Sequence, residues 1–243
     1  MNNVRTVSDT KRAFYNTHTR PVNSIYRRVV EELMVEMHLL TVNVDFRYDP
    51  IYALGVVTSF DRFMQGYRPE ADKASIFSAI CQSLGDHTPN YRGDAEHLLS
   101  LASQHPWEQL LSLPGQSSVS EANDLHQHLQ AIVSNPKFKY SRVFAIGLFT
   151  LLQTADPTLI KDEVKRTEAL KQVCSQLNLP QEKLQKDLEL YSSNLEKMIQ
   201  AQIVMEDLIK ADRKKREERA QAKAASTTAA ASEPPKDEAT SGS

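Results

Sequence analysis

The pattern of apolar and polar positions is organised around one stretch, residues 49–67, DPIYALGVVTSFDRFMQGY. Asp49 suits the N-cap of a helix, and Pro50 suits its first turn, where no backbone N–H is needed. The residues that follow are apolar on almost every side, which predicts a buried helix with neighbours around most of it. One narrow polar stripe interrupts this surface, formed by Thr58, Asp61, Arg62 and Gln65. The stripe is interpreted as a solvated edge, with a binding groove as the alternative.

A second, nearly all-apolar helix is predicted over residues 141–154. It contains Gly147, and the first buried helix contains Gly55. A glycine inside a helix costs about 1 kcal/mol relative to alanine. A close approach of the two helix backbones would justify this cost, so helices 50–66 and 142–154 are predicted to form the core pair.

The other apolar residues recur at helical spacing, and no segment alternates convincingly like a strand. Further helices are predicted at 6–17 with Ser8 as N-cap, 21–42 beginning at Pro21, 70–84, 94–104, 107–111, 120–133 and, as a polar surface helix, 159–177. Residues 113–118 are predicted to form a loop, and no internal repeat is evident. The fold class is therefore all-α, a single helical domain around two buried helices.

A long helix begins at Pro180 and carries a heptad seam. The seam consists of Leu184, Leu188, Tyr191, Leu195, Met198, Gln202, Met205 and Ile209, and the apolar stripe is widened by Ile199, Ile203, Val204 and Leu208. Beyond Ala211 the apolar face ends, and the segment from Ala224 is low in complexity. The predicted organisation is a globular helical domain at 1–179, a long C-terminal helix at 180–223 and a disordered tail at 224–243.

The length of this last helix predicts an interaction surface. About 44 helical residues span roughly 65 Å, whereas a domain of about 180 residues is roughly 40 Å across. The last turns are expected to project into solvent, with residues 200–219 available to a partner. The predicted partner-binding residues are the apolar Met198, Met205, Leu208 and Ile209 and the basic Arg213, Lys214, Lys215 and Arg216, which would steer an acidic partner or lipid headgroups. A frayed, unused extension is the alternative.

Composition and motifs argue against common chemistries. The 243 residues carry a net charge of −2, which provides no global attraction to nucleic acid. The seven glycines form no phosphate-binding loop, and no familiar catalytic or zinc motif occurs. Cys81 and Cys174 fit no metal or redox spacing and are interpreted as reduced thiols. His18 and His38 are interpreted as buried, hydrogen-bonded side chains. We therefore predict no catalytic, cofactor-binding or metal-binding residue.

Membrane insertion is also not expected. The longest apolar run, residues 143–152, is about half of a membrane span. The N-terminal segment has no apolar core of the kind that a secretory signal requires. A soluble protein is predicted, with membrane association that is at most peripheral.

Three blocks of sequence resemble the thylakoid formation protein family. They are residues 6–40 (TVSDTKRAFYNTHTRPVNSIYRRVVEELMVEMHLL), 45–67 (DFRYDPIYALGVVTSFDRFMQGY) and 135–153 (NPKFKYSRVFAIGLFTLLQ). The resemblance implies an all-helical, non-enzymatic accessory factor for photosystem II biogenesis and repair that acts with the thylakoid FtsH protease complex. It provides no catalytic residue. Since the first block begins at Thr6, a cyanobacterial form is expected, cytoplasmic and peripherally associated with the thylakoid membrane.

Two other classes of function remain open on the sequence. One is an enzyme with an unrecognised helical active site, in which Asp61 and Arg62 would be the reactive pair. The other is a pigment or lipid carrier that uses the apolar interior. A core without a pocket above about 300 Å³ would count against both.

Overall fold

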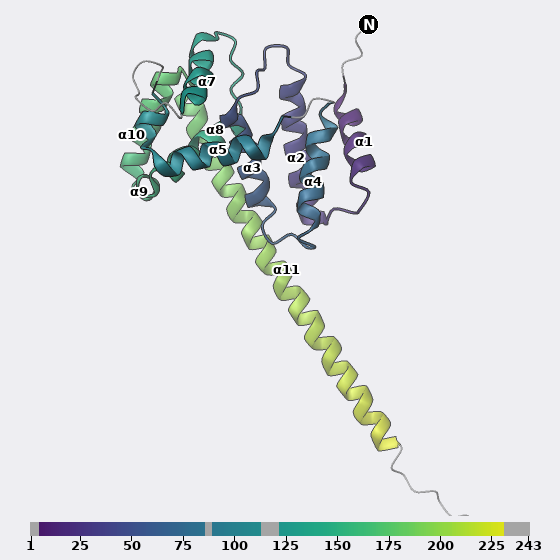
Figure 1. The fold of residues 1–243 in the computed structure, drawn as a ribbon. Coiled ribbons are helices and arrows are strands. Elements are labelled where there is room, and N and C mark those ends of the chain that lie inside the picture. The colour runs from purple at the N-terminus through teal and green to yellow at the C-terminus, as the bar shows by residue number, and fades with distance from the viewer. Residues whose placement is uncertain (1–4, 86–88, 113–121, 231–243) are drawn as a thin grey trace, which may run out of the picture. The chain divides into compact units, whose positions relative to one another are not determined.

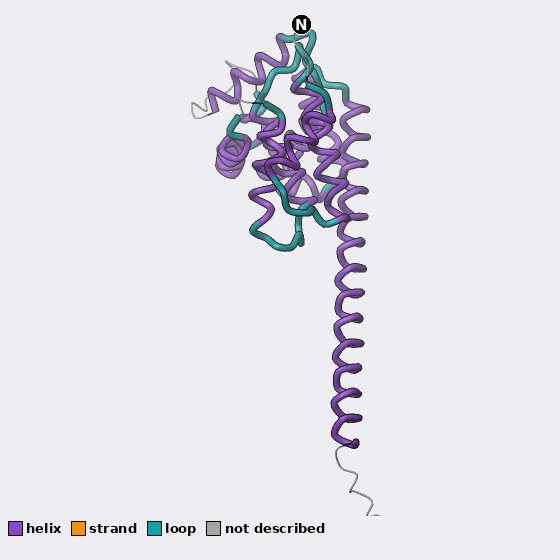
Figure 2. The backbone as a smooth tube through the Cα atoms, turned by 90° about the vertical axis from the view of Figure 1, so that its right-hand side faces the viewer, coloured by secondary structure: helices purple, strands orange, loops and turns teal. Residues whose placement is uncertain are grey.

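The computed structural model describes residues 5–85, 89–112 and 122–230, which form helices and loops without a strand (Figure 1, Figure 2). The all-α prediction is confirmed. The loop predicted at 113–118 and the tail beyond residue 230 lie outside the described residues. The chain divides into two compact units, Met1–Glu196 and Lys197–Ser243.

The described helices follow one another along the chain. Their bounds are α1 Val7–Thr17, α2 Ser24–Thr41, α3 Pro50–Phe63, α4 Asp72–Ser83, α5 Tyr91–Gln104, α6 Trp107–Leu110, α7 Asn123–Ser134, α8 Arg142–Ala155, α9 Pro157–Lys161, α10 Glu163–Leu177 and α11 Gln181–Ala230.

The centre of the first unit is the pair α3 and α8, as predicted. Their backbones approach so closely that a Cβ atom on Gly55 would lie 1.8 Å from the carbonyl oxygen of Val143. A Cβ atom on Gly147 would lie 1.9 Å from the carbonyl oxygen of Ile51. Only glycine fits at either position, which explains why both buried helices accept a residue of poor helix propensity.

The crossing of α3 and α8 is reciprocal, and so is its sequence. Residues 51–55 read IYALG and residues 143–147 read VFAIG, so the same residue types recur at matching positions. Each helix also begins with a side-chain cap. The Asp49 carboxylate accepts from the Tyr52 amide at 2.8 Å, and the Ser141 hydroxyl accepts from the Phe144 amide at 3.1 Å. No internal repeat is evident from the sequence pattern alone, and this short one becomes apparent from the crossing of the two helices.

The remaining helices of the first unit cover this pair. Helix α5 packs against both α3 and α8. Helix α1 packs against α4 and α2, and α2 also contacts α3, so these N-terminal helices gather together (Figure 1). Helix α9 packs against α8 and α10, and α10 also contacts α7. Large side chains are fully enclosed in this arrangement, among them Phe14, Tyr52, Phe60, Phe144 and Leu148.

Two predicted helix starts were wrong because other residues make the caps. Thr6, rather than Ser8, caps α1: its hydroxyl accepts from the Asp9 amide, and the Asp9 carboxylate accepts from the Thr6 amide. Helix α2 begins at Ser24 after its cap Asn23, three residues beyond the predicted start at Pro21.

The predicted polar surface helix 159–177 is in fact two helices, α9 and α10. Asp162 ends the first and caps the second, because its carboxylate accepts from the amides of Val164 at 3.0 Å and Lys165 at 3.1 Å. Helix α10 is not confined to the surface. It buries Ala169, Leu170, Val173, Cys174 and Leu177.

Helix α11 belongs to both units. Its first part, within residues 181–196, buries Leu184, Leu188 and Tyr191. The Tyr191 ring meets Phe63 of α3 edge to face, and the Tyr140 hydroxyl donates to Asp187 at 2.9 Å. The helix continues to Ala230, through residues 224–230 of the segment whose composition predicts disorder.

Candidate partner-binding surfaces

Beyond residue 197, α11 exposes large apolar side chains to solvent. We call residues 197–219 the distal segment. Its exposed apolar residues are Ile199 (42% exposed), Ile203 (55%), Val204 (58%), Leu208 (65%) and Ile209 (59%). Single exposed apolar side chains are common, but several within three turns of one helix are typical of an interaction surface.

The four apolar residues predicted to bind a partner differ in accessibility. Leu208 and Ile209 are exposed, whereas Met198 is buried and Met205 is intermediate. Ile199, Ile203 and Val204 were predicted to widen the apolar stripe but were not included in the predicted site, although Leu208, which also lies off the heptad seam, was included. Their apolar character outside the seam was the signal that could have identified them, since a seam residue is the one more often used for packing within the chain.

Most of the predicted basic run is engaged in ion pairs along the helix itself. Arg213 pairs with Glu217 at 2.9 Å, Arg216 with Asp212 at 2.9 Å, and Lys214 with Glu218 at 4.0 Å. Lys215 makes no ion pair with any described residue. Pairs of this kind on an exposed helix contribute only about 0.3–0.5 kcal/mol each, so a partner could exchange them at little cost.

Asp61 and Arg62, from the predicted polar stripe, contact different partners and do not act as a reactive pair. Both carboxylate oxygens of Asp61 accept from the Arg92 guanidinium of α5, at 2.9 and 3.1 Å. Arg62 points elsewhere and donates to the Gln153 side chain of α8 at 3.0 Å. The two residues of the hypothetical enzyme site are therefore used separately to tie neighbouring helices to α3.

His18 and His38 have the surroundings of structural side chains, not of catalytic ones. His18 Nδ1 lies 3.0 Å from the Ser75 hydroxyl, and His38 Nδ1 lies 2.9 Å from the Thr10 hydroxyl, which confirms both as buried and hydrogen-bonded. Burial lowers the pKa of each of these histidines.

Both thiols are free and buried, and burial raises the pKa of Cys81 to about 12 and that of Cys174 to about 11. Neither is a thiolate at neutral pH. Within the described residues, no group of three or more His, Cys, Asp or Glu side chains could hold a metal ion.

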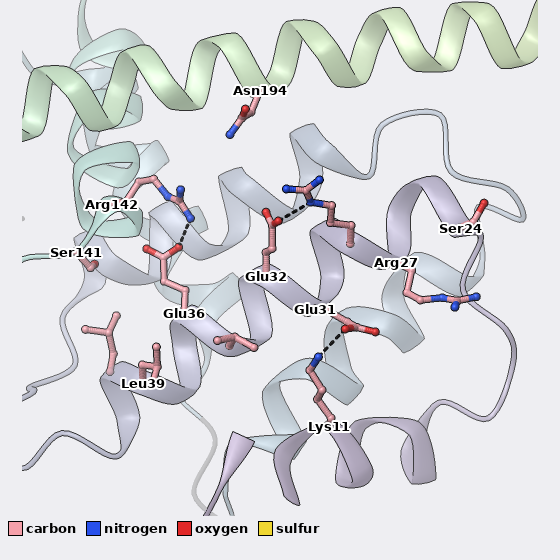
Figure 3. A pocket seen from close by; sticks show the side chains of 13 residues that line it. Lys11, Ser24, Arg27, Glu31, Glu32, Glu36, Leu39, Ser141, Arg142 and Asn194 are labelled. Atoms are coloured by element: carbon pink, nitrogen blue, oxygen red, sulfur yellow. Dashed lines mark hydrogen bonds and ion pairs between the residues drawn. The ribbon is translucent and has the colours of Figure 1, made fainter. Parts of the chain in front are cut away.

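A groove of about 930 Å³ lies in the first unit along the outer face of α2 (Figure 3). Three ion pairs cross or border it: Lys11 with Glu31 at 2.6 Å, Arg28 with Glu32 at 2.7 Å and Arg142 with Glu36 at 2.7 Å. The Lys11 ammonium that donates to Glu31 lowers the pKa of that carboxyl. The apolar part of the lining comes from Val35, Leu39 and Leu40, and Asn194 of α11 points toward it.

The groove is larger than the volume of about 300 Å³ below which a bound pigment or lipid could have been excluded by size alone. Its lining is nevertheless dominated by charged side chains that are already paired with one another. A pigment ring or an acyl chain requires a mostly apolar enclosure. The groove therefore does not resemble the interior cavity that a pigment or lipid carrier would need.

None of the described helices is both long enough and apolar enough to pass through a bilayer.

Comparisons with known proteins match nearly the whole chain. The sequence model of the thylakoid formation protein family matches residues 6–220. Protein Thf1 of Nostoc punctiforme is 61% identical over 222 residues, covering 91% of this chain and 94% of that protein. Protein Thf1 of Trichormus variabilis is 64% identical over 219 residues, covering 90% and 94%. A solved structure of Psb29 is similar with a TM-score of 0.73 at 45% identity, covering 87% of this chain and 98% of that one. The family match includes the distal segment of α11.

Proposed function

The chain belongs to the thylakoid formation protein family, and from this premise we propose that it is a non-enzymatic accessory protein for thylakoid biogenesis and for photosystem II assembly and repair. In this proposal it acts by binding and stabilising the thylakoid FtsH protease complex. It works in the cyanobacterial cytoplasm, peripherally associated with the thylakoid membrane, with photosystem II components as further partners and no nucleic acid.

The observation that supports a binding role is the exposure of the distal segment. Ile203, Val204, Leu208 and Ile209 are each more than half exposed. Removing each such side chain from water stabilises a complex by about 1.5–3 kcal/mol when burial is complete. The proposed site comprises Met198, Met205, Leu208 and Ile209 with Arg213, Lys214, Lys215 and Arg216. Because Met198 is already buried, its proposed contribution is to support the helix next to the contact.

The basic residues are proposed to act mainly on the rate of association. Exposed charges steer an oppositely charged partner toward the site, and added salt screens this attraction. The apolar residues are proposed to hold the complex once it has formed, because their contribution is largely independent of salt.

A chain that ends at Ala211 tests the basic half of this site. It lacks the predicted steering residues but keeps the residues of α11 that are described as buried, Leu184, Leu188, Tyr191 and Met198. We expect its melting temperature to stay nearly unchanged, its copurification with the FtsH complex from solubilised thylakoids to weaken, and the remaining binding to lose salt sensitivity. A chain that ends at Ala230 is the matched control and should bind like the full chain.

The apolar half is tested by Leu208→Ser combined with Ile209→Ser in the full chain. Leu190→Ser is the control, since Leu190 is an exposed apolar residue (46%) of α11 that lies before the distal segment. The double variant should lose most of the bound protease complex, whereas the control should retain it. If the Ala211 truncation and the double variant both copurify as well as the full chain does, the distal segment is not the binding site.

A further inference from the structure

The loop of residues 42–49, which connects the end of α2 to the start of α3, exposes apolar side chains to solvent (Figure 1). Val44 is 83% exposed, the most of any large apolar residue described, and Leu39 in the last turn of α2 is 58% exposed. Single exposed apolar residues are common on protein surfaces. The groups that surround these two therefore decide whether they form a contact surface.

The loop is anchored on the side that faces the core. The Phe46 ring meets the ring of the buried Tyr52 edge to face, with 5.1 Å between the ring centres. Within the loop, the Asp45 amide donates to the Asn43 side chain at 3.0 Å, and the Phe46 amide donates to the Asn43 carbonyl oxygen at 3.0 Å. Val44 is thus presented by a loop that is already ordered, which lowers the entropy cost of a contact there.

Cations from two connections surround these apolar residues. The α7–α8 connection contributes Lys137 and Lys139, which share one carboxylate: Asp45 lies 3.7 Å from the first ammonium and 3.5 Å from the second. Arg47 donates to two carbonyl oxygens of its own loop at 2.8 Å and makes no ion pair with a described residue. Since Asp49 is buried, the two connections present three cations against one carboxylate, whereas the whole chain has a net charge of −2.

Carboxylates of the neighbouring helices do not cancel this excess. Each of three accepts from a donor: Glu36 from Arg142, Asp187 from the Tyr140 hydroxyl and Asp94 from the Tyr48 hydroxyl. Arg142 neutralises Glu36, and Lys183, which lies 5.0 Å from the centre of the Tyr140 ring, offsets Asp187. With Asp94 counted as well, the surface stays positive.

We call Leu39, Val44, Arg47, Lys137 and Lys139 the loop patch. Its chemistry fits an anionic lipid surface better than a protein. Apolar side chains at a membrane surface enter the boundary between headgroups and acyl chains, while lysine and arginine remain at the level of the acidic headgroups. A specific protein interface needs a broader contact, about 1,000 Å² or more with an apolar centre, and two apolar side chains do not provide one.

We propose that the loop patch is the site at which this protein touches an anionic membrane. Val44 and Leu39 enter the headgroup region, and Arg47, Lys137 and Lys139 pair with acidic headgroups. The proposal rests on the peripheral membrane association proposed above and specifies its surface and its lipid. Few apolar side chains and a small charge excess give a weak and reversible contact, as peripheral association requires.

Sedimentation with vesicles of phosphatidylglycerol and phosphatidylcholine tests the proposal on the full chain at low salt. Leu39→Ser with Val44→Ser removes the apolar pair, and Lys137→Ala with Lys139→Ala removes two cations. Asp45→Asn removes the carboxylate that the two lysines share. Melting curves establish that each variant folds.

Helix α10 supplies the matched controls. Val164→Ser replaces a valine that is 78% exposed but follows Asp162 and Glu163 in the sequence. Lys165→Ala with Lys171→Ala changes the net charge by the same amount as the loop-patch lysine variant, at exposed positions of α10.

Each of the two loop-patch double variants should lower the affinity for anionic vesicles by about tenfold or more, and the controls should stay within about twofold of the full chain. Asp45→Asn should raise the affinity by about fivefold, because it leaves both lysines free for lipid. A residue that merely stabilised the fold would not produce a gain. Vesicles of phosphatidylcholine alone should bind weakly, and added salt should weaken binding to the anionic vesicles.

Copurification with the FtsH complex from solubilised thylakoids tests the proposed function separately, because detergent removes the bilayer. The loop-patch variants should copurify like the full chain. If they lose the FtsH complex but keep vesicle binding, the loop patch contacts a protein and the inference is wrong. It is also wrong if the full chain does not bind anionic vesicles, if the loop-patch variants bind them as the full chain does, or if Leu208→Ser with Ile209→Ser abolishes vesicle binding instead. In each of these cases, binding to the FtsH complex is still decided by the variants of the distal segment.

Discussion

Replacing Gly55 by alanine tests the central crossing most directly. The added methyl group would lie 1.8 Å from the Val143 carbonyl oxygen, whereas ordinary contact begins at 3.4 Å. The two helices must therefore separate locally by about 1.6 Å, or bend. The clash is with backbone, so no neighbouring side chain can turn away to relieve it. Gly147→Ala meets the Ile51 carbonyl oxygen at 1.9 Å and should behave in the same way.

The magnitude follows from two opposing effects. Alanine stabilises a helix by about 1 kcal/mol relative to glycine. Overpacking in a well-filled core costs about 1–3 kcal/mol and occasionally more, and a backbone clash on both sides of a fully buried crossing belongs at the upper end. We expect the free energy of unfolding to fall by about 2 kcal/mol net, which lowers the melting temperature of a domain of this size by roughly 4–8 °C.

The assay is chemical and thermal unfolding followed by circular dichroism. Gly93→Ala is the matched control, because the three atoms nearest to its Cβ would all belong to the Asn90 side chain, which can move. It should change the free energy of unfolding by no more than about 1 kcal/mol, through the Asn90 cap. If Gly55→Ala and Gly147→Ala both stay within about 0.5 kcal/mol of the unmodified protein, the close approach of the two helices is refuted.

The remaining predictions concern the core, pH and bound groups. Phe60→Ala and Leu148→Ala should each lower the free energy of unfolding by about 2–5 kcal/mol, measured by denaturant titration, because both side chains are fully buried and leave a cavity; losses below 1 kcal/mol for both would remove them from the core. Burial raises the pKa of Asp49 from 3.8 to about 7, so between these values the folded state binds more protons than the unfolded state. The stability contributed by this residue should fall as pH rises through that window, and Asp49→Ser, which retains a capping oxygen, should flatten the pH dependence of unfolding. The purified protein should contain no stoichiometric metal by elemental analysis and no visible absorption band, and either finding would contradict the non-enzymatic, non-carrier role.

Apolar periodicity predicted the helices well because burial on nearly all sides leaves little choice of structure. The two all-apolar segments became α3 and α8, and the glycine in each correctly indicated a backbone approach. It was less predictable which of several nearby polar residues would cap and begin a helix. Ser8 and Thr6 are both good cap residues, and the choice depends on Asp9 making the return hydrogen bond to Thr6. At Asp162, one carboxylate that accepts two amides divides a continuous helical pattern into α9 and α10.

The exposed apolar part of the last helix was predictable from the sequence, but the exposure of its individual residues was not. Length and the end of the apolar face indicated the distal part of the last helix. Heptad spacing selected Met198, which is buried, and omitted Ile203 and Val204, which are more than half exposed. A heptad seam that packs within the chain and one that is exposed for a partner have the same periodicity. Sequence spacing alone therefore does not distinguish a buried seam from an exposed one. The ion pairs that occupy Arg213, Lys214 and Arg216 likewise depend on side-chain conformations.

The segments IYALG of α3 and VFAIG of α8 have similar sequences and cross reciprocally. Each segment is therefore complementary in shape to a near copy of itself. Such an interface is isologous in character, although both halves belong to one chain. When two chains are unfolded at the same time, α3 of each chain could therefore pack against α8 of the other. Both crossings would then form between the chains. Refolding at high protein concentration is accordingly expected to produce domain-swapped dimers. Their fraction, measured by size-exclusion chromatography, should rise with concentration.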